Sequence, residues 1–358
     1  MKTEGVTKLD KNNQSTDFAV LELSTKAVKL LIGPQKELTS QEYFSFYLHD
    51  SFNFKHFYRT AEKPETGKGL NSDLIMDMNY FNRKVIKSIK KMMLEINRRD
   101  INKVVCVATA AYRKSKNQNE ILESIKNNCG ISVKVLSKQE EAEATYFAFM
   151  NSKPDWMDKD ESLILIDQGG GSIEITFFTK GIMKQTHSLG IGTTDIQQEL
   201  LNNIPSSLES LEEGFLRCHK FSHSYLRDMY LEANEKGLFD VEFEECVAVG
   251  TAITKSSGKK GNAKQHCFEM SKDFMQDKIN TADILYKELS ITTTSDLKKF
   301  LDSESDSYGK GAKIQEYLTV RLGLPMIIEI LERFNLDSLM ISGTGLWYGA
   351  YFQEIYKS

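Results

Sequence analysis

The chain has 358 residues, of which 40% are hydrophobic, 27% charged and 10% aromatic. This composition is typical of a globular protein and excludes a disordered or fibrous one. The formal net charge is −4, from 46 basic and 50 acidic residues, so no positive excess favours a nucleic-acid partner or an anionic membrane. A chain of this length predicts two domains of ordinary size.

The cysteines and the N-terminal segment indicate the compartment. The sequence has five cysteines and no CxxC pair, so we expect neither a disulfide framework nor a structural zinc site. Residues 1–17 are polar and contain no apolar segment, which predicts a flexible N-terminus and not a signal peptide. No run approaches 18 consecutive apolar residues. We therefore expect a cytoplasmic protein with no membrane partner.

The first part of the chain predicts strands followed by an amphipathic helix. Apolar and β-branched residues predict two strands and a short turn over residues 18–32. Residues 41–58 are rich in Phe and Tyr and predict further strand. Apolar residues at helical spacing predict a helix over 73–99. Four lysines in it are interpreted as its solvent-exposed face, with a polyanion site as the alternative: Lys84, Lys87, Lys90 and Lys91.

Strand and helix patterns continue along the chain. Residues 103–109 predict a strand, 117–128 a helix closed by Gly130, and 131–136 another strand. Two strands around a glycine turn are expected over 163–178. The remainder predicts mostly helix, with glycine turns at two further places: residues 249–251 and 341–345.

The most informative feature is an internal repeat. Residues 18–32 align without a gap with residues 163–177, and both copies contain an apolar strand, an acidic residue, a small polar turn and an apolar strand. The alignment pairs charged residues of the two copies: Glu22 with Asp167, and Lys29 with Glu174. A duplicated unit of this kind predicts two related α/β domains that face each other across a cleft.

The second turn has the composition of a phosphate-binding loop. It consists of Gly169, Gly170, Gly171 and Ser172. Glycines let the backbone approach a ligand, and the N–H groups of such a turn can converge on phosphate oxygens. Asp167 and Glu174 flank the turn and offer the hard oxygen ligands that Mg²⁺ prefers. The alternative is a glycine-rich hairpin with surface carboxylates. A dinucleotide-binding motif is excluded because a strand follows the glycines, and no P-loop sequence is present.

Charged residues near the predicted domain junction are candidates for catalysis. Ser137 and Glu140 have the spacing of a capping box, which predicts a helix with Glu140 and Glu141 in its first turn. A carboxylate there can accept a proton from a water that attacks phosphorus, or it only stabilises the helix. Arg113 follows a predicted strand and is either a phosphate ligand or an ordinary surface residue.

Two other groups have both a functional and a structural interpretation. His219 and His223 have a spacing that can hold zinc, but without a third ligand nearby we interpret them as exposed or packed residues. Lysines in residues 255–264 form either a solvated loop or a basic lip for a polyanionic substrate: Lys255, Lys259, Lys260 and Lys264.

The order and spacing of these motifs resemble the exopolyphosphatase / guanosine pentaphosphate phosphohydrolase (Ppx/GppA) family of the actin–hexokinase–heat-shock ATPase superfold. Residues 167–174 resemble its D-x-G-G-G-S-x-E, residues 109–117 its T-x-A-x-R-x-A-x-N and residues 136–142 its I-S-G-x-E-E-A. Residues 188–192 and 249–251 resemble two weaker motifs. The resemblance covers most of the chain and implies two actin-like (ribonuclease H-like) α/β domains with duplicated β-hairpin phosphate loops.

The resemblance also implies residue roles. It implies that Glu141 is the catalytic base and that Arg113 is a further catalytic residue, which holds the phosphate. It also implies that Asp167 and Glu174 bind Mg²⁺ or another divalent cation. The phosphate-binding residues that it implies are Ser24, Thr25, Lys26, Lys29, Gly169, Gly170, Gly171, Ser172, Gly250 and Thr251.

The first turn departs from the family pattern D-x-G-S-N-S-x-R. Ser24 replaces a glycine, which disfavours a positive φ in the turn. Lys29 replaces an arginine and so removes a bidentate fork. Lys26 and Lys29 keep positive charge, so we expect anion binding with a changed geometry.

We expect a flexible segment over residues 1–17, an N-terminal actin-like domain over 18–140 and a C-terminal one over 141–358. The leading hypothesis is a Mg²⁺-dependent phosphoanhydride hydrolase acting on polyphosphate or guanosine penta- or tetraphosphate. One alternative is a weakly active or inactive sensor that binds polyphosphate, an alarmone or a nucleotide. A kinase-like phosphotransferase is another, for which the sequence shows no acceptor pocket. A homodimer is left open.

Overall fold

In the computed structural model, the described residues are 17–25, 27–34, 46–51, 57–59, 74–151, 161–250, 253–254, 268–303 and 310–356. Most of the expected flexible N-terminus lies outside them, and the first strand already begins at Asp17. Lys26, Thr251 and the lysines of residues 255–264 also lie outside the described residues.

The first sheet has the strand order β3-β2-β1-β6-β7. Its strands are β1 (Asp17–Leu23), β2 (Ala27–Pro34), β3 (Phe46–Ser51), β6 (Lys103–Ala108) and β7 (Lys134–Val135). Strands β1, β2 and β3 pair antiparallel, and β6 and β7 extend the sheet in parallel. The strand expected over 131–136 is shorter than expected, because only two of its residues pair with β6.

The second sheet repeats this arrangement and adds one edge strand, in the order β10-β9-β8-β11-β13-β12. Its strands are β8 (Leu163–Gln168), β9 (Ile173–Thr179), β10 (Ile182–Leu189), β11 (Glu245–Gly250), β12 (Phe268–Ser271) and β13 (Ser338–Ile341). As in the first sheet, a hairpin and its antiparallel neighbour are followed by parallel strands. Strand β12 pairs antiparallel with β13 and has no counterpart in the described part of the first sheet.

The register confirms the repeat seen in the sequence. Glu22 lies opposite Lys29 in the β1–β2 pair, and Asp167 lies opposite Glu174 in the β8–β9 pair. Residues that align in the sequence therefore occupy the same cross-strand positions in the two hairpins. This confirms two related α/β units. The first unit is built on the sheet that contains β1, and the second unit on the sheet that contains β8.

Helices cover both faces of the first sheet because β1 is apolar on both sides. Ala19, Leu21 and Leu23 pack with α2 and α4, whereas Phe18 and Val20 pack with α12. Alternate residues of a strand point to opposite faces, so a continuous apolar run marks a strand buried on both sides.

The helices of the first unit largely follow the sequence pattern. They are α1 (Met78–Tyr80), a π-helical segment (Phe81–Val85), α2 (Ile86–Arg98), α3 (Ala110–Arg113), α4 (Gln118–Cys129) and α5 (Lys138–Met150). The helix expected from residue 73 begins later, because Leu74–Met76 forms β5 and pairs with β4 (Phe57–Arg59). The four lysines of this region are exposed, as expected of a solvated face. Gly130 closes α4 in a left-handed conformation, with a φ of 71°.

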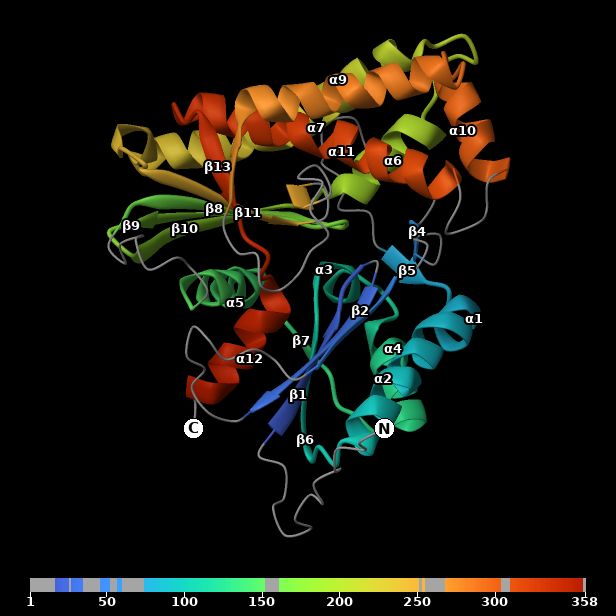
Figure 1. Ribbon diagram of the computed structural model, residues 1–358, viewed down its shortest axis with the longest axis vertical. Coiled ribbons are helices and arrows are strands. Elements are labelled where there is room, and N and C mark those ends of the chain that lie inside the picture. The colour runs from blue at the N-terminus through green and yellow to red at the C-terminus, as the bar shows by residue number, and fades with distance from the viewer. Residues whose placement is uncertain are drawn as a thin grey trace, which may run out of the picture.

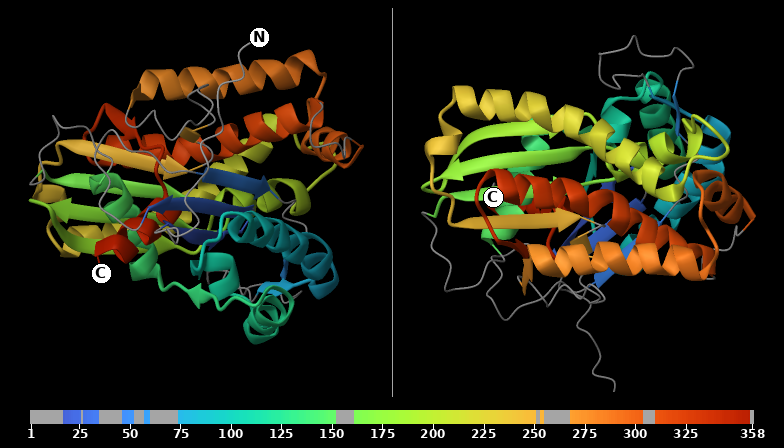
Figure 2. Two further views of the ribbon diagram at one scale, coloured as in Figure 1. Left: turned by 60° about the horizontal axis from the view of Figure 1, so that its bottom comes forward. Right: turned by 90° about the horizontal axis from the view of Figure 1, so that it is seen from above.

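The helices of the second unit lie mainly on one face of the second sheet (Figure 1). They are α6 (Thr193–Asn202), α7 (Leu211–Glu235), a 3₁₀ turn (Leu238–Asp240), α9 (Lys272–Glu288), α10 (Thr294–Ser303) and α11 (Lys310–Arg333). The last helix, α12 (Leu346–Tyr356), lies apart from them. The view from above in Figure 2 shows α11 between α7 and α9. Among the described residues, no helix is both long and apolar enough to cross a membrane.

Helices α5 and α12 join the two units, because each packs on the sheet of the other unit (Figure 1). Helix α5 follows the first sheet in sequence but packs on β8, β9 and β10, whereas α12 follows the second sheet and packs on β1 and β2. The two helices approach so closely that a Cβ added at Gly349 would lie 1.6 Å from the carbonyl oxygen of Ala144. The domain boundaries expected from the sequence stay a prediction, and the structure adds that the C-terminal helix packs with the N-terminal sheet.

Candidate active site

The turn between β8 and β9, residues 169–172, is here called the glycine loop, and each of its carbonyl groups accepts a hydrogen bond. Within the loop, the Gly169 N–H donates to the carbonyl oxygen of Ser172 (3.0 Å). Three successive carbonyl oxygens accept hydrogen bonds from outside the loop: Gly169 from the Thr193 N–H (3.1 Å), Gly170 from the Thr194 N–H (3.0 Å) and Gly171 from Lys114 Nζ (3.0 Å). Thr193 and Thr194 are the first residues of α6.

This arrangement directs three N–H groups to the opposite side of the loop. In a planar trans peptide, the N–H of a residue points away from the carbonyl of the residue before it. The N–H groups of Gly170, Gly171 and Ser172 therefore face away from Thr193, Thr194 and Lys114. Within the described part of the chain, none of the three donates a hydrogen bond. Successive open backbone N–H groups of this kind form an anion-binding concavity.

Glycine is required in and around this loop by close backbone contacts. A Cβ added at Gly192, which caps α6, would lie 2.3 Å from the carbonyl carbon of Gly170. A Cβ added at Gly171 would lie 2.7 Å from Thr25 Oγ1. The second contact shows that the turns of the two duplicated hairpins lie against each other, as the internal repeat predicts.

Gly250 ends β11 beside the strand that leads into this loop. Its φ is 130°, and an added Cβ would lie 2.3 Å from the carbonyl oxygen of Gln168. Only glycine adopts such a conformation without strain. The structure thus places Gly250 next to the loop, while its role in phosphate binding stays a prediction.

Two acids lie directly opposite each other where the second hairpin begins. Asp167 accepts a hydrogen bond from Thr145 Oγ1 (3.0 Å), and Glu174 accepts one from Ser188 Oγ (2.9 Å). Burial, together with the charges of Glu174 and Glu22, raises the pKa of Asp167 to about 7. Burial also raises the pKa of Glu174. Two desolvated carboxylates in one place are stabilised in their ionised form by a cation.

The equivalent pair in the first hairpin, Glu22 and Lys29, consists of one acid and one lysine. Lys29 Nζ lies 3.1 Å from Glu22 Oε2 and 3.7 Å from the centre of the Trp347 ring. In the turn itself, the N–H and the hydroxyl of Ser24 both donate to the carbonyl oxygen of Ala27. Glu22, Ser24 and Lys29 of the first hairpin are therefore engaged within the protein.

The donor set of the second hairpin fits a divalent cation of the Mg²⁺ type. Asp167 and Glu174 are hard oxygen ligands, and such ions are commonly held by one or two carboxylates with water and substrate oxygens. Among the described residues, no three His, Cys, Asp or Glu side chains converge as a complete metal site. A cation held here would therefore take its remaining ligands from water and substrate.

The structure separates the roles of the two acids in the first turn of α5. Glu140 completes the predicted capping box with Ser137 and also pairs with Lys134. These hydrogen bonds hold the pKa of Glu140 at about 2. Because both of its partners are structural, Glu140 acts in helix capping.

Glu141 is 4% exposed and lies against the start of α3. Its Oε1 accepts from the Ala110 N–H (3.1 Å), and its Oε2 lies 2.8 Å from Arg113 Nη1. Burial and the nearby charge of Glu174 raise the pKa of Glu141 to about 8, although Arg113 opposes this shift. Arg113 Nη1 also donates a hydrogen bond to the carbonyl oxygen of Leu136 (2.6 Å).

The residues that hold the loop were missed from the sequence. Thr193 and Thr194 follow the weak motif at residues 188–192. The sequence signal that could have located them is Asp195, an acid at the start of a helix. Asp195 accepts from the Gly192 N–H (2.9 Å), which fixes the start of α6. Lys114 gave no signal beyond its position next to Arg113.

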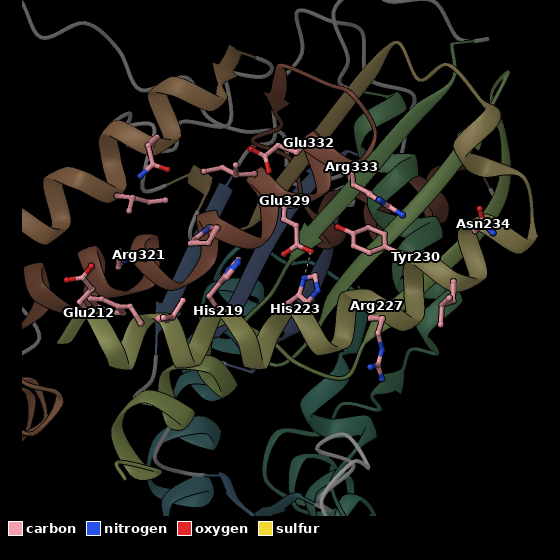
Figure 3. Close-up of a pocket in the computed structure, with 17 residues that line it drawn as sticks. Glu212, His219, His223, Arg227, Tyr230, Asn234, Arg321, Glu329, Glu332 and Arg333 are labelled. Carbon is pink, nitrogen blue, oxygen red and sulfur yellow. Dashed lines mark hydrogen bonds and ion pairs between the residues drawn. The ribbon is translucent and has the colours of Figure 1, made fainter. Parts of the chain in front are cut away.

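The histidines lie elsewhere, in a groove between α7 and α11 with a volume of about 1170 Å³ (Figure 3). His223 Nδ1 lies 2.6 Å from Glu329 Oε1, and His219 lines the same groove. Neither belongs to a group of three potential metal ligands among the described residues. None of the expected site residues lines this groove.

Comparisons with known proteins identify the relatives of this chain. A family model described as the Ppx/GppA phosphatase family matches residues 49–357. A bifunctional 3-dehydroquinate synthase/phosphatase from Fusobacterium nucleatum is 22% identical over 352 residues, which cover 97% of this chain and 48% of that protein. The chain thus spans about half the length of this curated relative.

Solved structures show the same fold. The PPX-GPPA enzyme of Aquifex aeolicus is 20% identical with a TM-score of 0.64, and the match covers 94% of this chain and 99% of that one. An exopolyphosphatase from Cytophaga hutchinsonii is 16% identical with a TM-score of 0.70, covering 95% and 98%. This likeness confirms the actin-like α/β fold that the sequence predicts.

Proposed function

Because the chain belongs to the Ppx/GppA phosphatase family, we propose that it hydrolyses phosphoanhydride bonds and releases the terminal phosphate of inorganic polyphosphate or of guanosine penta- or tetraphosphate. The observation that carries this proposal is the glycine loop with three open N–H groups beside the Asp167–Glu174 pair. The loop amides suit phosphate oxygens. Linear phosphoanhydrides present such oxygens at the end of a chain.

In this proposal, the loop and the two acids bind the substrate. The N–H groups of Gly170, Gly171 and Ser172 hold a terminal phosphate and offset the charge that develops on its oxygens. Asp167 and Glu174 would hold Mg²⁺, which when bound supplies positive charge next to the phosphate. The fixed positions of these groups also orient the phosphate for in-line attack.

Glu141 takes the proton of the attacking water. Its carboxylate is buried and held by the Ala110 N–H and by Arg113, so its orientation is fixed before substrate binds. The pKa of about 8 lies near neutral pH, where a general base accepts a proton most effectively. The charge of Arg113 keeps a share of Glu141 ionised at neutral pH.

A non-catalytic sensor is the second candidate, and the first hairpin favours it. Lys29 is engaged by Glu22 and by the Trp347 ring, so the first turn contributes less positive charge to an anion than its sequence suggests. A sensor of this kind binds polyphosphate or a guanosine polyphosphate and does not turn it over.

Incubation of the purified protein with Mg²⁺ and each substrate, followed by measurement of released phosphate, tests the proposal. Hydrolysis of at least one substrate, dependent on the divalent cation, is expected. Tight binding of a substrate without release at any Mg²⁺ concentration would favour the sensor instead. Binding and release both absent for all of these substrates would overturn the proposal.

A further inference from the structure

Lys114 joins the first unit to the phosphate loop of the second. It follows α3, which begins after strand β6 of the first sheet. Its Nζ donates to the carbonyl oxygens of Gly171 (3.0 Å) and Gly190 (3.3 Å). Gly171 lies in the glycine loop, and Gly190 follows β10. One lysine of the first unit therefore holds two backbone segments of the second.

Of the three glycine carbonyls that are held, only that of Gly171 depends on the other unit. The carbonyls of Gly169 and Gly170 accept from α6, which belongs to the same unit as the loop. Glycine has the freedom to rotate its peptide groups. Rotation of the Gly171–Ser172 peptide would turn its oxygen toward the bound anion and remove the Ser172 N–H from it.

The ammonium group of Lys114 lies in a largely desolvated place. Burial lowers the pKa of Lys114, while the charges of Asp195 and Glu174 oppose this shift. Burying an ammonium group costs free energy unless its hydrogen bonds are satisfied. Two of its three N–H donors are used by Gly171 and Gly190, and the third has no acceptor among the described residues. Lys114 thus places a positive charge and one N–H group that donates no hydrogen bond to the described residues next to the glycine loop.

We propose that Lys114 is a positioning residue of the phosphate site: it holds the Gly171–Ser172 peptide with its N–H toward the bound phosphate and couples this orientation to the contact between the two units. This inference rests on the proposed function, since it concerns the same loop. Separation of the units withdraws Lys114, frees the peptide and weakens anion binding. Anion binding in turn favours the joined arrangement, because coupling between two equilibria is reciprocal.

The test uses Lys114→Met and Lys114→Arg in the full chain, with Lys116→Met as the matched control. Lys116 is an exposed lysine on the same segment. Tripolyphosphate binding is measured by calorimetry in the presence of Mg²⁺, together with kcat and KM for phosphate release. Lys114→Met is expected to weaken binding by about 10- to 100-fold, the loss typical of a hydrogen bond to a charged group. Lys114→Arg is expected to recover most of this loss, and Lys116→Met to bind as the wild type does.

Hydrogen exchange gives a second readout that loss of stability alone would not produce. In the wild type, tripolyphosphate is expected to slow exchange at residues 110–114 as well as at the glycine loop. In Lys114→Met, the slowing at residues 110–114 is expected to disappear while that at the loop is reduced. If Lys114→Met does not fold, the comparison of Lys114→Arg with the wild type decides, and Lys114→Arg is expected to keep most of the wild-type affinity.

Three results would overturn the inference. Unchanged affinity of Lys114→Met is the first, and equal weakening by Lys114→Arg and Lys114→Met is the second. Protection of residues 110–114 that persists without the lysine is the third. In each case a wild-type protein that binds tripolyphosphate and releases phosphate leaves the proposed function standing. A wild-type protein that neither binds tripolyphosphate nor releases phosphate would overturn both the proposed function and this inference.

Discussion

Glu174 occupies in the second hairpin the position that Lys29 occupies in the first. Each lies directly across from an acid of the preceding strand. In the first hairpin the pair is an ion pair, whereas in the second it consists of two acids, of which Glu174 is buried and Asp167 half-buried. The duplicated hairpins therefore differ by one charge reversal, and the hairpin with two acids is the one next to the open N–H groups.

Glu174→Lys is expected to give the second hairpin the charge pattern of the first. The ammonium group of the new lysine would neutralise Asp167 in place of a bound cation. The substitution also removes the Glu174 carboxylate, which is one of the two proposed cation ligands. For the wild type, Mg²⁺ at about 100 times its dissociation constant should stabilise the fold by about 2.7 kcal/mol. Thermal unfolding of the variant with and without Mg²⁺ should show that this gain is lost, and phosphate release should fall with it. A variant still stabilised by Mg²⁺ as strongly as the wild type would argue against a cation on this pair.

The buried acids predict how stability depends on pH. The pKa of Asp167 is about 7 and that of Glu141 about 8 in the folded protein, above the ordinary values for these groups. The folded state thus binds more protons than the unfolded state between about pH 4 and 8, so stability falls as pH rises through this window. Thermal unfolding in the presence of a chelator should show a Tm that decreases from pH 5.5 to pH 8. Asp167→Asn should flatten this dependence.

Mg²⁺ should stabilise the protein more at pH 8 than at pH 5.5, because protonated carboxylates bind cations poorly. The comparison of the two Tm increments measures this effect. Equal increments at both pH values, or a Tm in chelator that rises toward pH 8, would contradict the assignment of raised pKa values to these acids.

Gly192→Ala is expected to distort the phosphate loop. The added methyl would lie 2.3 Å from the carbonyl carbon of Gly170, so the loop or α6 must move. Overpacking of this kind costs about 1–3 kcal/mol in unfolding free energy, and tripolyphosphate affinity should fall as well. Gly190→Ala is the matched control, since an added Cβ there meets nothing within 4 Å. Chemical denaturation and calorimetry of both variants check this expectation, and equal behaviour of the two would refute it.

Local sequence patterns predicted the hairpins and the helix caps well. The alignment of Glu22 with Asp167 predicted two hairpins of the same register, because strand pairing across a short turn is fixed locally. The Ser137 capping box and the Gly130 cap likewise depend on neighbouring residues alone. Of the two acids at residues 140 and 141, the capping pattern also predicted the structural role of Glu140.

Contacts between distant segments could not be predicted in this way. Lys114 reaches Gly171 and Gly190, which lie 57 and 76 residues further along the chain, and nothing in the pattern around Lys114 indicates its acceptors. The packing of α12 against α5 depends on the close approach of Gly349 to Ala144, which sequence periodicity does not encode. The engagement of Lys29 by Trp347 joins two ends of the chain in the same manner.

The most direct test of the account is a paired measurement on Glu141→Gln. The substitution keeps the shape of the side chain and removes its ability to take a proton from water. Phosphate release from polyphosphate or guanosine pentaphosphate should fall by about 10²- to 10⁴-fold, while tripolyphosphate still binds with Mg²⁺ at near wild-type affinity. Near wild-type release by this variant would contradict the account, because Glu141 would then have no part in the chemistry.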